Sequence, residues 1–447
     1  MILEAFLRSR TALACFSAVL FVILSVILSM AMTSPAEAKK KEKKSPADAA
    51  PTAALYKELD LFTKVLNLVQ DDYVEDPEGR ELVYGAIRGL LSTLDPHSVF
   101  MTPEAYRELR VDTEGRFGGV GLEVTVKNNV LTVVTAIEGS PAEKAGIHAG
   151  DRILKIDGIS TKEIGLGDAV RKMRGSRGSK VHLTLLREGQ PDPIEVYLHR
   201  DTIRIKSVRS NLEEEGFGYI RISSFQEDTD EDLRKNLETL EKKNKGPLKG
   251  LVIDLRNNPG GLLDEAVDVC DDFLESGTIV TTASRNQEVD RRTASKSGQE
   301  PTYPLIIMVN GGSASAAEIV AGALQDHKRA VLLGTATFGK GTVQTIFELG
   351  DGAALKLTVA KYYTPKGRSI QAEGIKPDVV VEAQKPRIAS SKDRYTSEKD
   401  LKGHLEENNR PKEEKKKEAS EAKAEEEDYQ KRVALDYLKS WQVFQKK

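Results

Sequence analysis

Hydrophobic residues fall three or four positions apart in the first third of the chain. The clearest run consists of Leu55, Leu59, Phe62, Leu66 and Val69. A second run with the same spacing, RELVYGAIRGLLSTL, follows a short polar gap. This spacing gives each segment one apolar face and is typical of amphipathic helices. We therefore expect a small helical region over residues 55–112.

The pattern changes to strand-like runs at Gly118. GGVGLEVTV and NVLTVVTAI are followed by a short helix in SPAEKAG, a strand in DRILKIDG, a helix in LGDAVRKMRG, and two last strands in KVHLTLLR and IEVYLHR. Short β-type runs that end at glycine, asparagine or aspartate predict strands joined by turns. Residues 113–202 should therefore form a β-rich domain with two helices.

Strands and helices alternate over residues 203–385. The apolar runs YIRISSF, GLVIDLR, PLIIMVN and AVLLGT are separated by helical patterns. This alternation predicts an α/β domain with a parallel or mixed sheet and crossover helices. Ligands of such sheets bind at the carboxyl ends of the strands. The turns RNNPGG and NGGSAS both stand at such ends, so they are the first places to look for a site.

The two ends of the chain differ from this body. Arg8 and Arg10 precede an uncharged apolar stretch, Thr11 to Met32, and small residues at Ala36 and Ala38 follow it. This order predicts an export signal over residues 1–38, which is either cleaved or kept as a membrane anchor. Residues 39–54 are basic and rich in proline and alanine, as in a linker.

The last segment, residues 386–447, is a mixed-charge run that ends in an amphipathic helix, YQKRVALDYLKSWQVF. A run of this composition cannot build a core of its own. The helix either docks onto the body or joins a partner chain. Its apolar stripe, with no evident partner in the sequence, consists of Leu435, Leu438, Trp441 and Phe444.

Net charge, histidine spacing and cysteine count exclude several classes of partner and site. The 447 residues carry a formal net charge of −3, so no overall basic field attracts nucleic acid. The six histidines lack the spacing of a zinc site. With Cys15 in the leader and Cys270 in an expected core helix, no disulfide framework forms in the mature body. We expect no nucleic-acid partner, no metal and no cofactor.

Ser315 in NGGSASAAEI has two interpretations. With Glu318 three positions on, it is a capping box that starts a helix, and taken alone the pattern favours this. A serine at a helix N-terminus is also well placed for nucleophilic attack, because the N–H of Ala316 and the helix dipole can stabilise an oxyanion. A second N–H donor could come from the Gly260–Gly261 turn.

A nucleophilic serine needs a base, and no histidine stands in a recognisable triad motif. A conventional Ser-His-Asp site would require His97 or His327 beside Ser315. The other candidate is Lys340 in FGKGTVQ, with Gln344 four residues on. Burial would lower the pKa of the lysine and let it accept the serine proton, while the Gln344 carbonyl could orient the amine. A solvated loop lysine is the ordinary alternative.

The β-rich unit resembles a PDZ domain, chiefly through GSPAEKAGIHAGDRILKIDGIS. The resemblance implies that a loop binds a terminal carboxylate. Glycines in such a loop expose N–H groups that form an anion nest, and the neighbouring strand edge accepts an extended peptide. The alternative is a turn that binds nothing. The loop consists of Gly118, Gly119, Val120, Gly121 and Leu122.

The motifs LDPHSVFM, VIDLRNNPGG, NGGSASAAEI, FGKGTVQ and TPKGRSIQAEGIKPD resemble, in this order, the carboxyl-terminal processing proteases of peptidase family S41. The resemblance implies a ClpP/crotonase-like catalytic core over residues 203–385. It makes Ser315 the nucleophile, Lys340 the base and Gln344 its orienting partner. It also makes the N–H groups of Gly261 and Ala316 the oxyanion hole.

We therefore expect a multidomain α/β serine endopeptidase of the bacterial envelope, periplasmic or anchored to the inner membrane. Its PDZ domain would bind protein substrates with apolar C-termini. The sequence leaves room for a homo-oligomer and for an envelope adaptor protein. The alternative is a catalytically inactive PDZ scaffold that only binds peptides.

Overall fold

The computed structural model describes residues 46–286, 289–296, 298, 300–383, 403 and 428–445. The expected export segment and most of the charged run before the last helix lie outside these residues. Among the residues described, no helix is long and apolar enough to cross a membrane. The chain divides into two units after Leu82.

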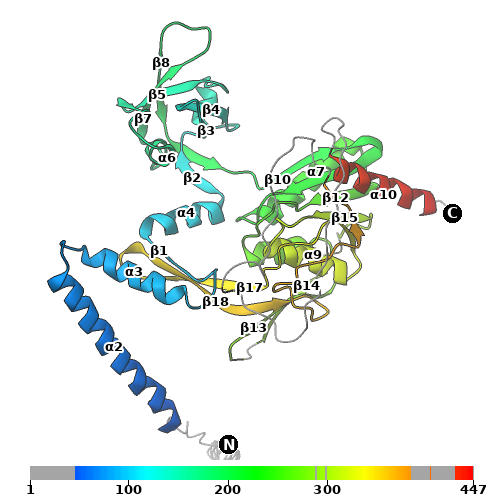
Figure 1. Cartoon of the computed structure of the whole chain (residues 1–447). Coiled ribbons are helices and arrows are strands. Elements are labelled where there is room, and N and C mark those ends of the chain that lie inside the picture. Colours follow the sequence, from blue (N-terminus) through cyan, green and yellow to red (C-terminus); the bar gives the residue numbers. More distant parts are fainter. Residues whose placement is uncertain are drawn as a thin grey trace, which may run out of the picture. The chain divides into compact units, whose positions relative to one another are not determined.

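The first unit contains one long helix, α2 (Pro46–Asp72), drawn in blue in Figure 1. It begins inside the stretch that we expected to be a linker, which ends at residue 54. The apolar side chains that predicted the helix lie largely in solvent: Leu55 is 60% exposed and Leu59 is 48% exposed. The helix therefore exists as predicted, but none of its side chains over residues 55–72 is buried.

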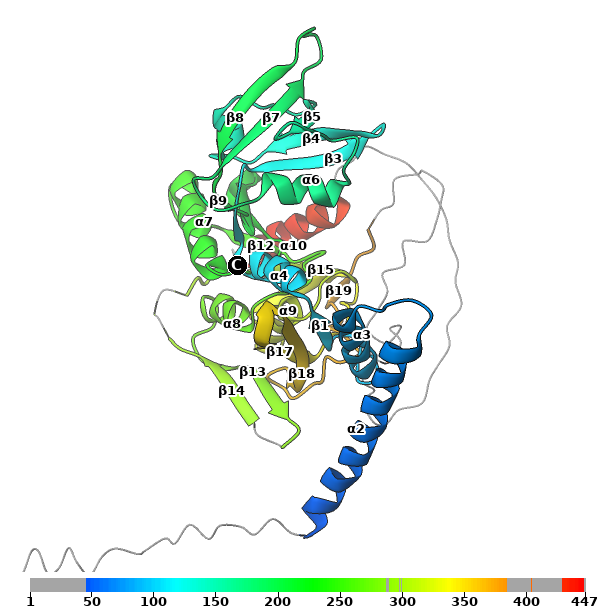
Figure 2. The same cartoon turned by 90° about the vertical axis from the view of Figure 1, so that its left-hand side faces the viewer.

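The second unit begins within helix α3, at Val83, and includes the β-rich domain. Strand β3 stands at one edge of the domain's main sheet, which has the order β3-β4-β5-β7-β8, with β6 paired to β5. These strands lie side by side in both views (Figures 1 and 2). Strands β2 and β9 form a separate pair. The first elements are α3 (Gly79–Leu91), β1 (Val99–Met101), α4 (Pro103–Glu114), β2 (Arg116–Gly119), β3 (Leu122–Lys127), β4 (Val130–Ala136), α5 (Pro141–Lys144), β5 (Arg152–Ile156), β6 (Ile159–Ser160), α6 (Leu166–Met173), β7 (Lys180–Leu186), β8 (Ile194–His199) and β9 (Asp201–Arg204).

The α/β region is built on a six-stranded sheet of order β10-β11-β12-β15-β16-β19. All its pairs are parallel except β10 with β11. The central strands β12 and β15 are buried along their whole length, as their continuous apolar sequences predict. The strands are β10 (Val208–Leu212), β11 (Phe217–Ile222), β12 (Gly250–Asp254), β15 (Leu305–Val309), β16 (Ala330–Gly334) and β19 (Val379–Val380).

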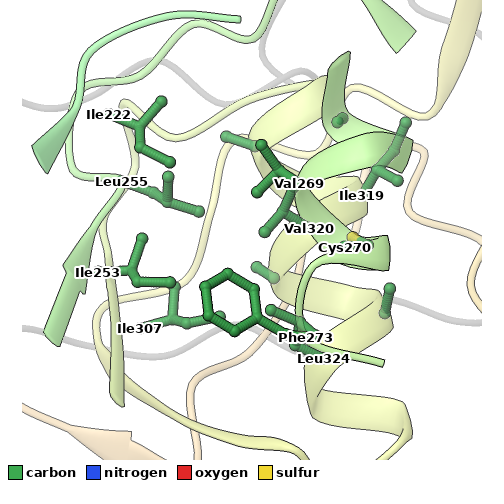
Figure 3. Close-up of a cluster of buried hydrophobic side chains, with 14 of the residues drawn as sticks. Ile222, Ile253, Leu255, Val269, Cys270, Phe273, Ile307, Ile319, Val320 and Leu324 are labelled. Carbon is green, nitrogen blue, oxygen red and sulfur yellow. The ribbon is translucent and has the colours of Figure 1, made fainter. Parts of the chain in front are cut away.

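Helices cover both faces of this sheet. On one face, Ile253 and Ile307 pack against α8 (Leu263–Asp271) and α9 (Ala316–Asp326), as Figure 3 shows. Helix α7 (Thr229–Asn244) adds Leu233 and Leu240 to the same core. Cys270 lies fully buried in this cluster as a free thiol, as the sequence predicted for a core helix.

The opposite face is covered by the C-terminal helix α10 (Tyr429–Gln445). Its Ala434 and Leu438 are buried against Ile306 and Met308 of the sheet. Of the two alternatives for this helix, docking onto the body is therefore the one that the structure shows for Leu438. Trp441 and Phe444, in the same expected stripe, remain 52% and 78% exposed.

A second, antiparallel sheet of order β1-β18-β13-β14, with β17 also paired to β18, flanks the core. The sequence did not predict it, because the pairs of β18 with β1 and with β13 join distant segments. Short 3₁₀ turns lie at Glu214–Gly216 and Gly350–Gly352. The strands are β13 (Gly277–Ser284), β14 (Val289–Ala294), β17 (Thr342–Glu348) and β18 (Ala354–Tyr363).

Candidate active site

Ser315 stands at the N-cap of α9, in the loop that follows the central strand β15. Its backbone has φ 56° and ψ −117°, a conformation that a residue with a side chain rarely adopts. Such strain persists only where the surroundings impose it, and it clusters at functional sites. The observation thus distinguishes Ser315 from an ordinary cap, whose backbone is extended.

The loop before Ser315 is fixed by its neighbours. The Ser313 hydroxyl donates to the carbonyl of Leu255 over 2.7 Å and accepts from the N–H of Asn310 over 3.0 Å. Asn310 in turn accepts from the N–H of Asn257 over 2.9 Å, and donates to the Asn257 side chain over 3.0 Å. These contacts join the RNNPGG and NGGSAS turns at the carboxyl ends of β12 and β15. Ser313 is therefore a structural serine.

Glu318 links the serine loop to the lysine loop. Its carboxylate is fully buried, and its Oε2 accepts hydrogen bonds from the N–H groups of both Ser315 and Lys340, each over 2.9 Å. Its Oε1 accepts from the N–H of Gly339 over 2.8 Å and from the Thr337 hydroxyl. The capping box exists, as expected, but the same carboxylate also holds the segment that carries the candidate base.

The ionisation of Glu318 reflects two opposed effects. Burial raises its pKa to about 7, although the hydrogen bonds from Thr337, Lys340, Ser315 and Gly339 act to lower it. Each of these four donors favours the ionised form. Protonation of Glu318 near neutral pH would therefore weaken the hydrogen bonds that connect the two loops.

Lys340 precedes strand β17, and Gln344 lies within that strand. The carbonyl of Lys340 accepts from the Tyr362 hydroxyl, and its N–H is held by Glu318, so its backbone is fixed at both ends. Among the residues described, no hydrogen bond joins the Ser315 hydroxyl to the Lys340 amine or the Lys340 amine to Gln344. Catalytic hydrogen bonds commonly tighten only when substrate binds.

Two backbone donors lie next to Ser315. A side chain at Gly260 would come within 2.8 Å of Ser315 Cβ and 3.0 Å of the Ala316 nitrogen, so the Gly260–Gly261 turn directly contacts the serine. Within the described chain, the N–H groups of Gly261 and Ala316 donate to no protein acceptor. Unpaired N–H groups beside a nucleophile are what an oxyanion hole requires.

The two candidate histidines make other contacts. His327 is the C-cap of α9, at the opposite end of the helix from Ser315, and its Nε2 lies 2.7 Å from the carbonyl oxygen of Thr278. His97 follows Asp95 in a turn, where its N–H donates to the Asp95 carboxylate over 2.8 Å. This geometry gives no support to a Ser-His-Asp site. The described residues also contain no group of three or more acidic, histidine or cysteine side chains suited to a metal.

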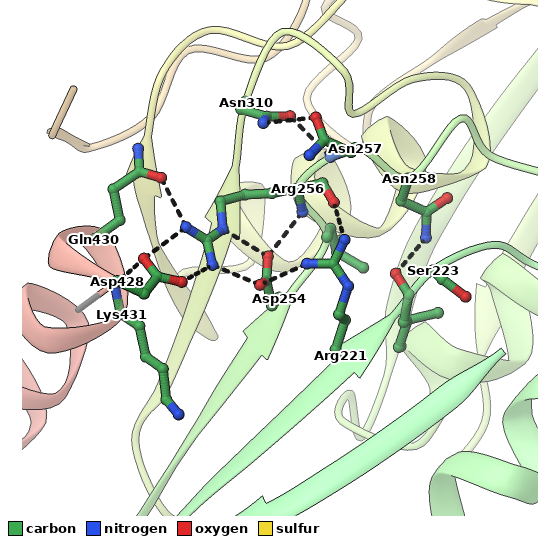
Figure 4. Close-up of polar contacts among 12 residues, drawn as sticks. Arg221, Ser223, Asp254, Arg256, Asn257, Asn258, Asn310, Asp428, Gln430 and Lys431 are labelled. Atoms are coloured by element: carbon green, nitrogen blue, oxygen red, sulfur yellow. Dashed lines mark hydrogen bonds and ion pairs between the residues drawn. The ribbon is translucent and has the colours of Figure 1, made fainter. Parts of the chain in front are cut away.

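Arg256 organises a polar network that the sequence did not predict (Figure 4). It forms an ion pair with Asp254, which is fully buried at the end of β12, over 2.7 Å. It also donates to Asp428 over 2.9 Å and to Gln430 over 2.9 Å at the start of α10. The network therefore fastens the C-terminal helix to the segment that leads into the glycine turn. The adjacent charges in IDLRN were the only sequence signal.

The expected carboxylate-binding loop joins β2 to the edge strand β3. Gly121 has φ 77°, and a side chain there would come within 2.2 Å of Ser140 Cβ, so the position requires glycine. The N–H groups of Val120 and Gly121 donate to no acceptor in the described part of the chain. Gly118, Gly119 and Leu122 lie in the flanking strands. Helix α6 packs Val170 against the same domain core.

Comparison with known proteins agrees with this architecture. Residues 216–381 match the model of peptidase family S41, residues 132–187 match a PDZ domain, and residues 15–105 match the activating protease CtpB N-terminal domain.

The chain is also similar along most of its length to curated proteins. It is 46% identical to a carboxy-terminal-processing protease of Bartonella bacilliformis, over 78% of this chain and 81% of that protein. It is 39% identical to the carboxy-terminal processing protease CtpA of Bacillus subtilis, over 72% and 69% of the two chains. A solved photosystem II D1 C-terminal processing protease is 33% identical over 72% of this chain and 92% of that one, with a TM-score of 0.43. On its identity to the two curated proteins, the chain belongs to the carboxy-terminal processing proteases of peptidase family S41.

Proposed function

We propose that the protein is a serine endopeptidase in which Ser315 is the nucleophile, Lys340 the general base and Gln344 the residue that orients the lysine. The observation that carries this proposal is the shared carboxylate oxygen of Glu318, which holds the backbones of Ser315 and Lys340 together. A nucleophile and its base must be held in one fixed arrangement before proton transfer can be efficient.

The steps follow from these groups. A neutral Lys340 amine takes the proton from the Ser315 hydroxyl as its oxygen attacks the carbonyl carbon of the scissile bond. The N–H groups of Gly261 and Ala316 stabilise the negative charge on the former carbonyl oxygen. The lysine then gives its proton to the departing amine, which leaves an acyl-enzyme on Ser315. Water releases the acyl group by the same steps in reverse.

The PDZ domain supplies recognition of the substrate tail. A terminal carboxylate would accept from the N–H groups of Val120 and Gly121, while the extended tail adds a strand to the free edge of β3. Leu122 and Val124 of this strand are partly buried apolar side chains. Apolar substrate tails should therefore bind best beside them. The export pattern at the N-terminus would deliver the enzyme to the bacterial envelope, where unfolded envelope proteins are its substrates.

The test measures cleavage of an unstructured protein substrate by the full chain. Ser315→Ala and Lys340→Ala should each lose at least about a thousandfold in kcat while keeping the wild-type melting temperature. His97→Ala should retain the activity, because the proposal gives that side chain no part in proton transfer. A folded Lys340→Ala enzyme with normal kcat would refute the base assignment. A wild-type chain that binds the tail without cleaving would instead be a peptide-binding scaffold.

A further inference from the structure

The LDPHS segment lies against β18, the strand that pairs with the one that carries Gln344, although the mechanism above gives it no task. Asp95 is 9% exposed, and its Oδ1 accepts from the N–H groups of His97 and Ser98, over 2.8 and 2.9 Å. Its Oδ2 accepts from the Ser98 hydroxyl over 2.6 Å. The Ser98 oxygen then accepts from the N–H of Thr358 over 3.1 Å, which fixes the turn to β18.

The Thr358 hydroxyl connects this turn to Gln344. Its Oγ1 donates to Asp95 Oδ1 over 3.1 Å and lies 3.3 Å from Gln344 Nε2. Burial alone would raise the pKa of Asp95, but hydrogen bonds from Ser98, His97 and Thr358 outweigh it and keep the pKa below its usual value. An ionised carboxylate can only accept hydrogen bonds. The single Thr358 hydrogen is therefore committed to Asp95, and the oxygen can only accept from Gln344.

Thr342 provides further acceptors for the Gln344 amide nitrogen. Gln344 Nε2 donates to Thr342 Oγ1 over 2.9 Å and lies 3.3 Å from the Thr342 carbonyl oxygen, which has no hydrogen to give. The contacts with the Thr342 carbonyl oxygen and with the Thr358 oxygen would become repulsive if the amide turned over, because neither atom has a hydrogen to donate to it. The nitrogen is thus assigned by the chemistry of its neighbours, independently of how the two ends of the amide are drawn. Its carbonyl oxygen accepts from no residue in the described part of the chain.

The sheet register brings these groups together. In the β17–β18 ladder Thr342 pairs with Lys361 and Val343 with Ala360, but Gln344 pairs with Thr358. A regular ladder would have placed Val359, which has no hydroxyl, opposite Gln344. The extra residue is a β-bulge, a feature that commonly re-aims a side chain beside a functional site.

We propose that Thr358 and Asp95 are positioning residues, which hold the Gln344 amide with its nitrogen on the threonines and its oxygen available to the Lys340 amine. This inference rests on the proposed role of Lys340 and Gln344 and adds the groups that set the direction of the amide. An amide turned the other way would present N–H groups to the lysine and occupy the lone pair that must take the serine proton.

The test is a double-mutant cycle on the full chain, with an unstructured substrate of fixed tail. Thr358→Val removes the hydroxyl and nearly keeps the volume, whereas Thr358→Ser keeps the hydroxyl. We expect Thr358→Val to lower kcat at least tenfold with KM within twofold, and Thr358→Ser to stay within threefold of wild type. In a Gln344→Ala background, Thr358→Val should cost less than twofold more, because its target is gone. Thr358→Ala provides the same comparison if valine is not tolerated.

The pH dependence separates positioning from a structural role. A carbonyl oxygen facing the amine favours the ammonium, so losing it should move the acid limb of the kcat profile to lower pH in both Thr358→Val and Gln344→Ala. The inference is overturned if Thr358→Val costs as much without Gln344 as with it, or lowers kcat without moving the limb. Full activity of Gln344→Ala would instead refute the proposed role of Gln344 itself.

Discussion

Arg256, which follows a central strand, donates hydrogen bonds to Asp428, the residue before the C-terminal helix, 172 positions further along the chain. Arg256 is 13% exposed, and Asp428 is 38% exposed. The pair joins the end of β12 in the catalytic core to the start of α10, the helix that covers one face of the sheet. It also makes the helix part of the folded enzyme rather than a tail.

Replacing Asp428 with asparagine should therefore destabilise the enzyme. The charge-assisted bonds to a largely buried arginine are lost, which costs on the order of 1–3 kcal/mol of unfolding free energy. Denaturant unfolding of the full chain measures the change. Trp441→Ala on the exposed side of the same helix is the control and should stay within about 0.5 kcal/mol. Equal stability of Asp428→Asn and wild type would contradict the anchoring role of the pair.

Glu318→Gln tests whether the Glu318 carboxylate must connect the loop of Ser315 to the loop of Lys340. An amide offers one accepting oxygen where the carboxylate offers two, so two of the four donors would face an N–H₂ group. We expect kcat to fall about 10- to 100-fold, equivalent to losing one or two charge-assisted hydrogen bonds. Steady-state kinetics and circular dichroism would show whether activity falls while the fold persists. A variant with wild-type kcat would show that the shared carboxylate is dispensable.

Glu318 should also give the stability a particular pH dependence. Its pKa rises from an ordinary 4.5 to about 7 on folding, so between these values the native state binds more protons than the unfolded state. The contribution to unfolding free energy is fully present below about pH 4.5, falls as the pH rises to about 7, and is then constant.

This dependence can be isolated by comparing Ser315→Ala with Ser315→Ala/Glu318→Gln, which removes self-cleavage from both samples. The difference in unfolding free energy between them should decline with pH over that window, by on the order of 3 kcal/mol. A difference that does not vary with pH would mean that Glu318 keeps an ordinary pKa.

Much of the fold was predictable because local patterns determine it. The unbroken apolar runs GLVID and LIIMV required cover on both faces of the sheet, and the structure has it. The sequence could not identify α10 as the second cover, since a long charged run separates that helix from the strands. The antiparallel sheet was missed for a related reason: β1 and β13 pair with β18 across long separations that leave no local periodicity.

The candidate site divides in the same way. Local rules place Ser315 and Ala316 at a helix N-terminus and Gly261 in a glycine turn at a strand end, whereas the roles proposed for them came from the resemblance to the family. The capping role of Glu318 was readable too. Its bonds to the lysine loop depend on how a segment more than twenty residues away returns to the helix, and no spacing rule gives that. The register shift opposite Gln344 was equally invisible.

Gly260→Ala should disable the candidate oxyanion hole. The backbone there has φ 98°, and the added methyl group would lie 2.8 Å from both the Ala314 carbonyl oxygen and Ser315 Cβ. We expect kcat to fall at least a hundredfold, in the range for losing one oxyanion donor. Gly189→Ala is the matched control, because φ is 82° there and no atom lies within 4 Å of the added methyl group. This variant therefore introduces backbone strain without a steric clash. If both variants lost the same small fraction of activity, contact with the serine loop would not explain the glycine.

The last prediction concerns how the PDZ domain reads a substrate tail. Two unstructured substrates that differ only in the final residue, leucine or aspartate, would be compared for KM and kcat. Wild type should cleave the leucine substrate with a KM at least tenfold lower, because Leu122 and Val124 offer an apolar edge. In Gly121→Val, the new side chain would collide with Ser140 and displace the N–H groups that receive the carboxylate. This variant should lose the preference while still cleaving a short peptide that does not need the PDZ domain. If it distinguished the two tails as well as wild type does, the tail would be read elsewhere in the chain.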